Sequence, residues 1–285
     1  MSNTIAAKGG TFTIGNDITI NRMGYGAMRI TGDGVWGPPA SHDESIAVLK
    51  KCVDLGIDFI DTADSYGPFV SEELIREALH PYDGLLIATK GGLERQGPNK
   101  WPINATPKHL EIALKGSLLR LDVEQIDLYQ LHRFDPDVPK AETLGKLKEL
   151  QDEGLFKHFG VSEVSVEDLE EASQHMTITT VQNMYNLQER KHEPVLQWCE
   201  QNGAAFIPWY PLAANKLEKE KVQPIADRHD ASVHQIALAW LLHHSDCILP
   251  IPGTSSVAHL VDNTKAAAIQ LSDEDMAQLN AIGKP

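Results

Sequence analysis

The feature that most constrains the fold is a regular alternation of short apolar segments with longer amphipathic ones, repeated along nearly the whole chain. The apolar segments predict strands at 22–25, 57–61, 85–89, 126–131, 158–161, 179–182, 205–208 and 247–249. The amphipathic segments predict helices at 44–55, 71–79, 107–120, 140–153, 166–174, 192–201, 233–243 and 257–268. Such alternation is typical of βαβ units that build a parallel sheet.

Eight strand–helix pairs favour a closed (β/α)8 barrel, the TIM barrel, over an open doubly wound sheet. An open sheet that binds a dinucleotide would be expected to carry GxGxxG after an early strand, and that motif is missing. The segment 11–20 alternates around Gly15-Asn16-Asp17 and predicts a β-hairpin that closes the bottom of the barrel. We expect residues 1–285 to form one α/β domain, with the loops 91–105 and 210–221 above the mouth.

Composition and charge narrow the range of partners. Apolar residues make up 42% and charged residues 23% of the chain, as in ordinary globular proteins. A formal charge of −15 would repel nucleic acid and anionic membrane surfaces. The three cysteines are widely spaced and predict free thiols, so we expect a cytoplasmic protein. The twelve histidines show no metal-ligand spacing, and we expect no metal.

Polar side chains stand where three neighbouring predicted strands end. Asp61 and Tyr66 follow the second strand, Lys90 follows the third and His132 follows the fourth. Because the carboxyl ends of barrel strands face the mouth, we expect these side chains to converge. Reducing a carbonyl needs a proton donor. A phenol with a pKa near 10 donates poorly unless neighbouring groups shift its pKa. We expect Lys90 to lower the pKa of Tyr66, with Asp61 holding Lys90 in place.

Each of these residues has an ordinary structural alternative. Asp61 could cap a loop, His132 could be a satisfied core histidine, and Lys90 could pair with a surface acid. Their joint occurrence at adjacent strand ends favours a site.

The pattern Asp61-x-Ala63-x-x-Tyr66, with Lys90 after an apolar strand and Leu131-His132 at a strand end, resembles the aldo-keto reductase superfamily over nearly the whole chain. The resemblance implies an oxidoreductase that reduces small aldehydes or ketones with hydride from a nicotinamide cofactor. It implies that Tyr66 is the general acid and that Lys90 and Asp61 adjust the pKa of Tyr66. It also implies that His132 orients the substrate.

The resemblance also implies a cofactor site at the remaining strand ends. Ser162 and Gln182 would hold the nicotinamide carboxamide, and Trp209 would stack on the ring. The segment after the eighth strand would bind the adenosine phosphate. The implied cofactor-binding residues are Gly26, Ala27, Met28, Asp61, Ser162, Glu163, Gln182, Trp209, Tyr210, Pro211, Leu212, Gly253, Thr254, Ser255, His259, Asp262 and Asn263.

Two departures from the family pattern bear on that site. Glu163 stands where most members have Asn, and Gly253 and His259 stand where basic side chains often occur. Hydroxyls and backbone amides remain for a 2′-phosphate, so we expect NADP(H) in preference to NAD(H), which stays open.

Aromatic side chains on the mouth loops predict the substrate pocket. The candidate substrate contacts are Trp36, Tyr66, Trp101, His132 and Tyr210. Trp36 and Trp101 could equally anchor their own loops. The segment 251–260 is similar to bacterial members near the pyridoxal reductases, so pyridoxal is one candidate beside sugars and other aldehydes.

Two further functions are weighed against the reductase. The barrel is also similar to channel-associated β-subunits, which bind NADPH with little turnover; this alternative needs a partner surface that the sequence does not reveal. A metal-assisted hydrolase would need a ligand cluster that the sequence lacks. We expect a monomer that acts on a small carbonyl compound.

Overall fold

The computed structural model describes residues 4–213 and 217–283. Residues 214–216 of the predicted loop 210–221 therefore lie outside the described residues. Within the described ranges, one parallel sheet runs in chain order through β3 (Tyr25–Gly26), β4 (Phe59–Asp61), β5 (Leu86–Gly91), β6 (Ile126–Leu131), β7 (Phe156–Ser162), β8 (Ile178–Gln182) and β9 (Ala205–Phe206).

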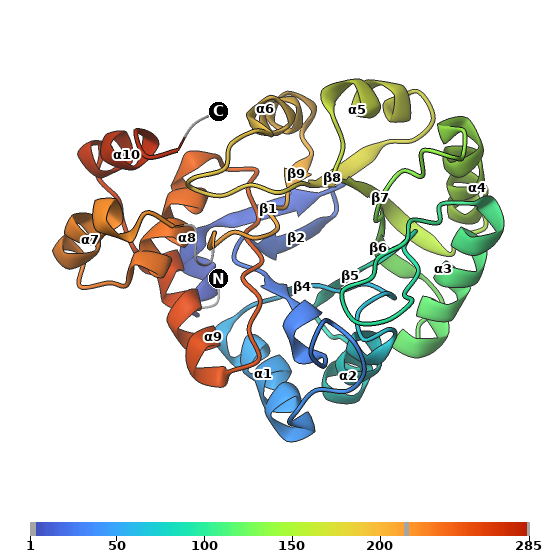
Figure 1. The fold of residues 1–285 in the computed structure, drawn as a ribbon, viewed down its shortest axis with the longest axis horizontal. Coiled ribbons are helices and arrows are strands. Elements are labelled where there is room, and N and C mark those ends of the chain that lie inside the picture. The colour runs from blue at the N-terminus through green and yellow to red at the C-terminus, as the bar shows by residue number, and fades with distance from the viewer. Residues whose placement is uncertain (1–3, 214–216, 284–285) are drawn as a thin grey trace.

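Helices surround this sheet in a ring, as Figure 1 shows. They are α1 (His42–Leu55), α2 (Val70–Leu79), α3 (Pro107–Leu121), α4 (Lys140–Asp152), α5 (Val166–Ser173), α6 (Glu193–Asn202), α7 (Lys219–Arg228), α8 (Val233–His244), α9 (Val257–Thr264) and α10 (Asp273–Asn280). Short 3-10 helices are η1 (Ala6–Gly9), η2 (Ala27–Ile30) and η4 (Lys265–Ala268).

Helix ends follow the local sequence. Ser41 accepts a hydrogen bond from the backbone of Glu44 and starts α1, which ends at Gly56 with φ of 80°. Thr106 caps α3, and Pro107 stands in its first turn, where a missing N–H costs nothing. Such caps fix the residue at which each helix begins. They therefore also fix where the loop between a strand and its following helix ends.

The predicted eighth strand, 247–249, is wrong as a regular strand. Only an isolated bridge joins Ile248 to Phe206. The segment nevertheless closes the barrel, because the N–H of Leu249 donates to the carbonyl of Phe206 at 2.8 Å and that of Gly24 donates to Pro250 at 3.0 Å. Pro250 and Pro252 lack the N–H that a longer ladder requires, which explains the short pairing. The chain thus forms the (β/α)8 barrel that the alternation predicts.

The first predicted strand, 22–25, is also shifted, since pairing starts only at Tyr25. The backbone N–H of Arg22 donates to the carbonyl of Gly10 instead of to a barrel strand. The Arg22 side chain is also used outside the sheet. It lies at the barrel bottom and donates to the carbonyls of Gly9, Leu242 and Ser245, each at 2.9 Å. Arg22 therefore joins the N-terminal segment to the end of α8.

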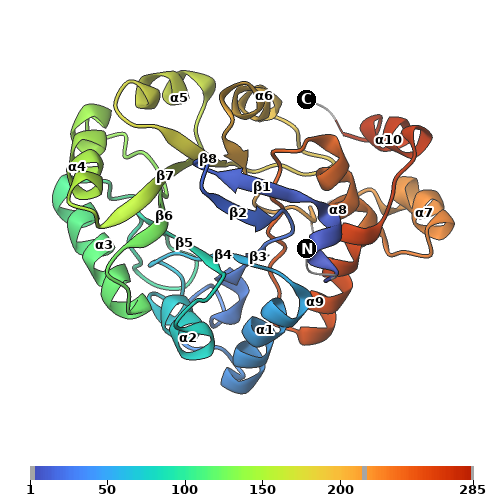
Figure 2. The same cartoon turned by 180° about the vertical axis from the view of Figure 1, so that it is seen from behind.

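The predicted hairpin is confirmed as β1 (Thr11–Ile14) and β2 (Ile18–Asn21), which pair antiparallel. Gly15 and Asn16 have φ of 59° and 71°, the positive values that a tight hairpin turn needs. Ile14 and Ile20 pack inside the barrel against Phe59 and other inward-facing strand residues. Figure 2 shows the hairpin across the end of the barrel that faces away from the viewer in Figure 1. The hairpin therefore leaves only the carboxyl ends of the strands open to ligands.

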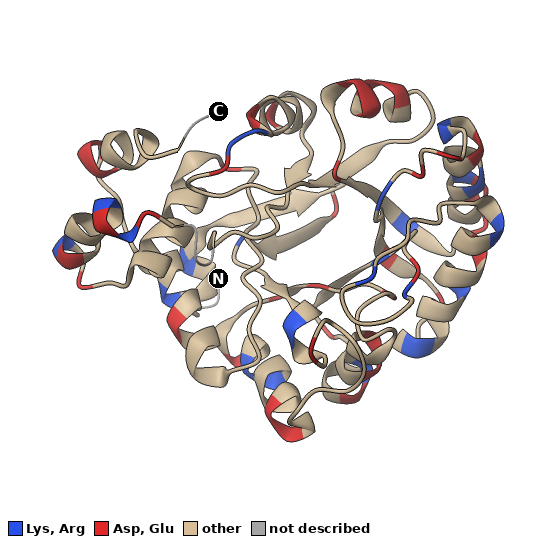
Figure 3. Cartoon of the chain, in the orientation of Figure 1, with Lys and Arg blue, Asp and Glu red and all other residues tan. Residues whose placement is uncertain are grey.

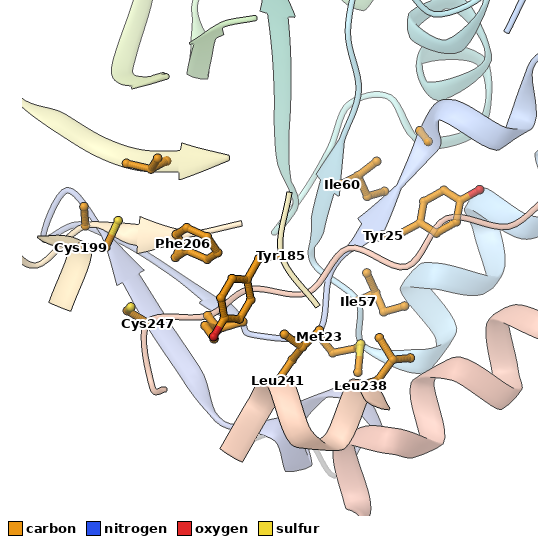
Figure 4. Close-up of a cluster of buried hydrophobic side chains, with 14 of the residues drawn as sticks. Met23, Tyr25, Ile57, Ile60, Tyr185, Cys199, Phe206, Leu238, Leu241 and Cys247 are labelled. Carbon is orange, nitrogen blue, oxygen red and sulfur yellow. The ribbon is translucent and has the colours of Figure 1, made fainter. Parts of the chain in front are cut away.

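The main apolar core lies between the sheet and the helices. Figure 4 shows Leu238 and Leu241 of α8 beside Met23 and Ile57, together with Phe206 of β9. The side chains of Met23, Leu238 and Phe206 are fully buried. Burial of a side chain of this size contributes roughly 1.5–3 kcal/mol, so this layer fixes where the strand ends lie.

Two helices beyond the predicted repeat cover α8. The segment 210–221 is predicted as a loop, but α7 begins at Lys219 within it. The acidic segment 272–275, whose composition indicates a helix start, begins α10. α8 is buried from Val233 to Leu242 apart from His234, because α7, α9 and α10 pack on it. A helix that is apolar on all sides needs such cover.

Charged residues concentrate on the outer helices and loops, as Figure 3 shows. α4 carries both signs, whereas the first turn of α10 is acidic, with Asp273, Glu274 and Asp275. Acidic side chains in a first turn are favoured by the helix dipole. Across the described residues, no helix is both long enough and apolar enough to cross a membrane.

Candidate active site

Polar residues at the carboxyl ends of five consecutive strands meet at the barrel mouth. Asp61 ends β4, Lys90 lies near the end of β5, His132 follows β6, Ser162 ends β7 and Gln182 ends β8. A cavity of about 630 Å³ opens there. Its lining includes these predicted residues: Gly26, Met28, Asp61, Tyr66, Trp101, His132, Ser162, Gln182, Trp209, Tyr210, Pro211, Leu212 and Gly253.

Lys90 joins the phenol to the carboxylate at the centre of this site. Its Nζ donates to Asp61 Oδ2 at 2.6 Å, to the carbonyl of Thr62 at 2.8 Å and to the hydroxyl of Tyr66 at 3.3 Å. Lys90 is fully buried, and Asp61 and Tyr66 are 2% and 7% exposed. All three ammonium protons therefore have acceptors, and the position of Nζ is fixed.

Lys90 lowers the pKa of Tyr66, as expected, but its contribution is not the largest one. Burial raises the pKa of Tyr66 above its ordinary value and outweighs the lowering by Lys90. Burial also lowers the pKa of Lys90, but Asp61 and Tyr66 raise it above the ordinary value. At neutral pH the site therefore holds a protonated phenol beside an ammonium ion.

His132 lies on the other side of the phenol. The two rings meet edge to face with centroids 6.0 Å apart. Burial, followed by the charges of Lys90 and Arg133, holds the pKa of His132 well below its ordinary value. The imidazole is therefore neutral at physiological pH and can donate one hydrogen bond to a carbonyl oxygen without carrying charge.

Two amides hold the second oxygen of Asp61. Gln130 and Gln182 donate to Oδ1 at 3.0 and 2.9 Å. Gln130 is not among the residues predicted from the sequence, although the two-residue period of a strand puts it on the same face of β6 as His132. Gln182, expected to hold a carboxamide, lines the cavity and also supports the carboxylate.

Glu163 contacts Trp209 rather than the cavity. Its Oε1 accepts from Trp209 Nε1 at 2.5 Å and from the backbone of Met184 at 2.7 Å. The backbone of Glu163 has φ of 55°, and its side chain is outside the cavity lining. Glu163 therefore fixes the orientation of the Trp209 indole, which lines the cavity.

Arg95, which the sequence analysis does not single out, ties the mouth loops together. Its guanidinium donates to the carbonyls of Gly34, Val35, Ser65, Gly97 and Lys100. It also lies 3.6 Å from the centroid of a Trp101 ring and 5.6 Å from that of Trp36. The sequence signal that was available is that Arg95 and Trp101 share the predicted mouth loop 91–105.

The aromatic substrate contacts divide into two groups. Trp101 meets Tyr66 edge to face with centroids 6.4 Å apart, and Tyr210 lines the cavity wall. Trp36 is 37% exposed and lies outside the lining, so the structure does not bring it into the site. It packs beside Arg95 and bridges to Gly67, which is the loop-anchoring alternative.

Several implied cofactor residues lie beyond the cavity. Those outside its lining are Ala27, Glu163, Thr254, Ser255, His259, Asp262 and Asn263. The residues after Gly253 form the start of α9, where Ser256 caps the helix. His259 is exposed, whereas Asn263 is 8% exposed and lies one helical turn further on. The start of α9 therefore follows Gly253, which is part of the cavity rim, after a few residues.

Two backbone segments, at Gly26 and at 251–253, pack closely against each other at the cavity rim. A Cβ on Gly26 would stand 2.8 Å from the carbonyl of Ile251, and one on Gly253 would stand 2.7 Å from the carbonyl of Gly26. Only glycine permits this approach. Arg29 lines the cavity next to these glycines and adds a cation at the rim. Donors, a cation and an indole therefore fit a nicotinamide dinucleotide.

The described residues contain no group of three or more histidine, cysteine or acidic side chains that could hold a metal ion. Cys52, Cys199 and Cys247 are free and buried.

Comparison with known proteins assigns the family. The family model described as "Aldo/keto reductase family" matches residues 22–284. An uncharacterized oxidoreductase of Schizosaccharomyces pombe is 53% identical over 281 residues, covering 98% of this chain and 92% of the relative. The pyridoxine 4-dehydrogenase of Escherichia coli is 39% identical, with 96% of this chain and 98% of that protein covered.

A solved structure supports the same assignment. The aldo-keto reductase of Klebsiella pneumoniae, crystallised in complex with NADPH, superposes with a TM-score of 0.81 at 28% identity. The match covers 95% of this chain and 94% of that one.

Proposed function

The chain belongs to the aldo/keto reductase family of oxidoreductases, and on that premise we propose that it reduces small aldehydes and ketones with NADPH, with Tyr66 as the proton donor. The contact of Lys90 with the Tyr66 hydroxyl at the cavity wall carries this proposal. A buried phenol beside an ammonium ion is the arrangement that proton transfer to an alkoxide requires.

NADPH is the proposed cofactor, and when bound it supplies hydride to the carbonyl carbon. The Klebsiella pneumoniae relative was crystallised with NADPH, which supports the preference over NADH. In this chain Trp209 would contact the nicotinamide ring, and Ser162 and Gln182 would bind its carboxamide. The start of α9 offers backbone amides and hydroxyls for the phosphate of the adenosine half.

Tyr66 donates the proton in the proposed reaction. Its oxygen accepts a hydrogen bond from Lys90, so its own proton is free to point into the cavity. The raised pKa keeps that proton on the phenol until the carbonyl oxygen becomes a much stronger base. Lys90 then stabilises the phenolate that remains, and Asp61 keeps Lys90 in position.

His132 orients the substrate in this proposal. A neutral imidazole hydrogen-bonds the carbonyl oxygen and leaves proton donation to Tyr66. Aromatic side chains of Trp101, Trp209 and Tyr210 offer flat apolar contacts for the rest of the substrate.

Pyridoxal is the first substrate to test. The Escherichia coli relative is a pyridoxine 4-dehydrogenase, and pyridoxal is the aldehyde of that alcohol. Its planar ring suits an aromatic cavity of about 630 Å³. Residence in the cytoplasm, a monomeric state and a single domain over 1–285 stay predictions.

Steady-state assays test the proposal. Purified protein is mixed with NADPH or NADH, and oxidation at 340 nm is followed with pyridoxal, benzaldehyde and a small ketone. We expect turnover with NADPH for at least pyridoxal, and slower turnover with NADH. Tight NADPH binding without oxidation by any carbonyl would contradict the reductase function.

A further inference from the structure

Arg133 is a cation at the barrel mouth that the proposed reaction does not use. It follows His132 at the end of β6, is partly buried and lines the same cavity as Tyr66. Its charge is close enough to the phenol that each group influences the pKa of the other. A guanidinium in this position faces any substrate whose carbonyl oxygen approaches Tyr66.

The hydrogen bonds of Arg133 leave most of its donors unused. Nη1 donates to the carbonyl of His132 at 2.5 Å and to Ser162 Oγ at 2.8 Å. Within the described part of the chain, Nη2 and Nε have no recorded partner. A guanidinium has five N–H donors in a planar fork that suits a carboxylate. At least three N–H groups therefore remain for a ligand.

Three other arginines that are partly or largely buried use the whole fork. Arg22, Arg95 and Arg190 each donate from Nε, Nη1 and Nη2 to backbone carbonyls. Arg120 instead pairs with the buried carboxylate of Glu72 at 2.6 Å. Arg133 differs from both cases, because it has neither a full set of backbone acceptors nor a paired carboxylate among the described residues.

The charge of Arg133 also lacks a direct counter-ion. Its guanidinium forms no ion pair within 4.0 Å among the residues that the structure describes. The acid that influences its pKa is Glu163, whose Oε1 already accepts from Trp209 and from the backbone of Met184. Lys90, the cation in contact with Tyr66, is neutralised by Asp61. Arg133 therefore adds a positive charge without a direct counter-ion to the cavity wall.

We propose that Arg133 determines substrate specificity by binding an anionic oxygen, a carboxylate or a phenolate, on carbons near the reacting carbonyl. The protein as a whole carries a formal charge of −15, which repels anionic substrates at long range. A partly desolvated guanidinium at the cavity wall reverses that preference locally. The inference rests on the proposed reductase function and assigns a substrate class to the same cavity.

A substrate series tests the proposal within one enzyme. Wild-type kcat/KM is measured with NADPH for benzaldehyde, for its 2-, 3- and 4-carboxy derivatives and for pyridoxal, whose ring carries a hydroxyl next to the aldehyde. We expect at least one carboxylate isomer, or pyridoxal, to exceed benzaldehyde by about 10- to 100-fold, the range of a charge-assisted hydrogen bond. The carboxylate and phenolate arms distinguish the two anions.

Substitution then assigns the preference to one side chain. In Arg133→Gln the ratio of anionic to neutral kcat/KM should fall by the same factor of about 10 to 100. Arg133→Lys, the matched control that keeps the charge, should retain a preference above that of Arg133→Gln. Equal losses for anionic and neutral substrates would mean that Arg133 only positions His132 and Ser162, and would overturn the proposal.

Two further readouts keep the outcome clear. If Arg133→Gln weakens NADPH binding and leaves the substrate ratio unchanged, the side chain serves the cofactor and the proposal is wrong. If the variant does not fold, wild-type inhibition decides, because benzoate should inhibit at least tenfold more strongly than benzyl alcohol. Wild-type turnover of every aldehyde without an anionic preference refutes this inference alone, whereas no turnover at all refutes the proposed function.

Discussion

Asp61→Asn is the substitution whose effect follows most directly from the geometry. Lys90 is fully buried, and the Asp61 carboxylate at 2.6 Å is its charged partner. The substitution leaves an ammonium ion with two neutral acceptors, the carbonyl of Thr62 and the hydroxyl of Tyr66. Removing one partner of a buried ion pair costs about 3–5 kcal/mol.

Hydrogen-bond direction adds to this loss. Asp61 accepts from Lys90 with one oxygen and from the amides of Gln130 and Gln182 with the other. The new amide would turn its NH2 either toward Lys90 or toward the two glutamines, so donors would face donors. We therefore expect the upper part of the range, and the pKa of Lys90 should fall because burial lowers it and Asp61 no longer opposes that effect.

Thermal unfolding measures the destabilisation. At ~2 °C per kcal/mol for a chain of this size, Asp61→Asn should melt about 8–10 °C below wild type. Asp58→Asn is a matched control, because Asp58 accepts only from the backbone and side chain of Asn21 and forms no ion pair among the described residues. Burial raises the pKa of Asp58 to about 6, so its loss of charge should cost much less at pH 6.

A double variant separates the unpaired charge from general damage. Lys90→Met added to Asp61→Asn removes the stranded ammonium and should recover part of the lost stability. If Asp61→Asn melts within about 1 °C of wild type, or if the second substitution lowers the melting point further by its full single-variant effect, the buried ion-pair argument is refuted.

Other predictions concern pH and the mouth loops. His132 should give no NMR titration between pH 6 and 8, because burial and nearby cations hold its pKa well below the ordinary value; a midpoint near 6.5 would contradict this. Burial raises the pKa of Asp275, but hydrogen bonds from Arg228 and His229 outweigh it and lower the pKa. The stability it contributes is therefore present above about pH 4 and lost as pH falls further, so the melting points of wild type and Asp275→Asn should converge in acid; a constant gap would contradict this. Arg95→Met should raise KM for aromatic aldehydes by about tenfold and speed proteolysis within 91–105, whereas unchanged values would show that the loops do not need this side chain.

Sequence periodicity predicts most of the barrel because the apolar segments of the sequence are the strands that the folded barrel buries. Strand ends could be located from apolar segments such as 126–131, and the known direction of barrel strands then brought Asp61, Lys90 and His132 to one edge. The segment 247–249 could not be judged in the same way, since apolar character indicates burial and says nothing about how many ladder hydrogen bonds form.

α7 was missed for a different reason. It is mostly polar and has Pro224 inside it, which argues against a helix in a sequence. The need for its cover is indicated by α8, whose residues 236–242 are apolar on every side. Cover of a partner helix is a tertiary requirement, which a window of one helix does not reveal.

The net pKa of Tyr66 also lay beyond the sequence. The sign of the contribution from Lys90 follows from charge alone, but the opposing contribution depends on how far water is excluded, and Tyr66 is 7% exposed. The same holds for Glu163 and Arg95, since their roles depend on which carbonyls and indoles the folded loops bring near.

Single-turnover reduction by Tyr66→Phe tests the central claim most directly. The variant is loaded with NADPH, its dissociation constant is measured by fluorescence, and it is mixed with pyridoxal in a stopped-flow instrument. The account predicts NADPH binding within about twofold of wild type and a hydride-transfer rate at least about 100-fold lower, because the proton donor held by Lys90 is gone. A rate within a few-fold of wild type would contradict it.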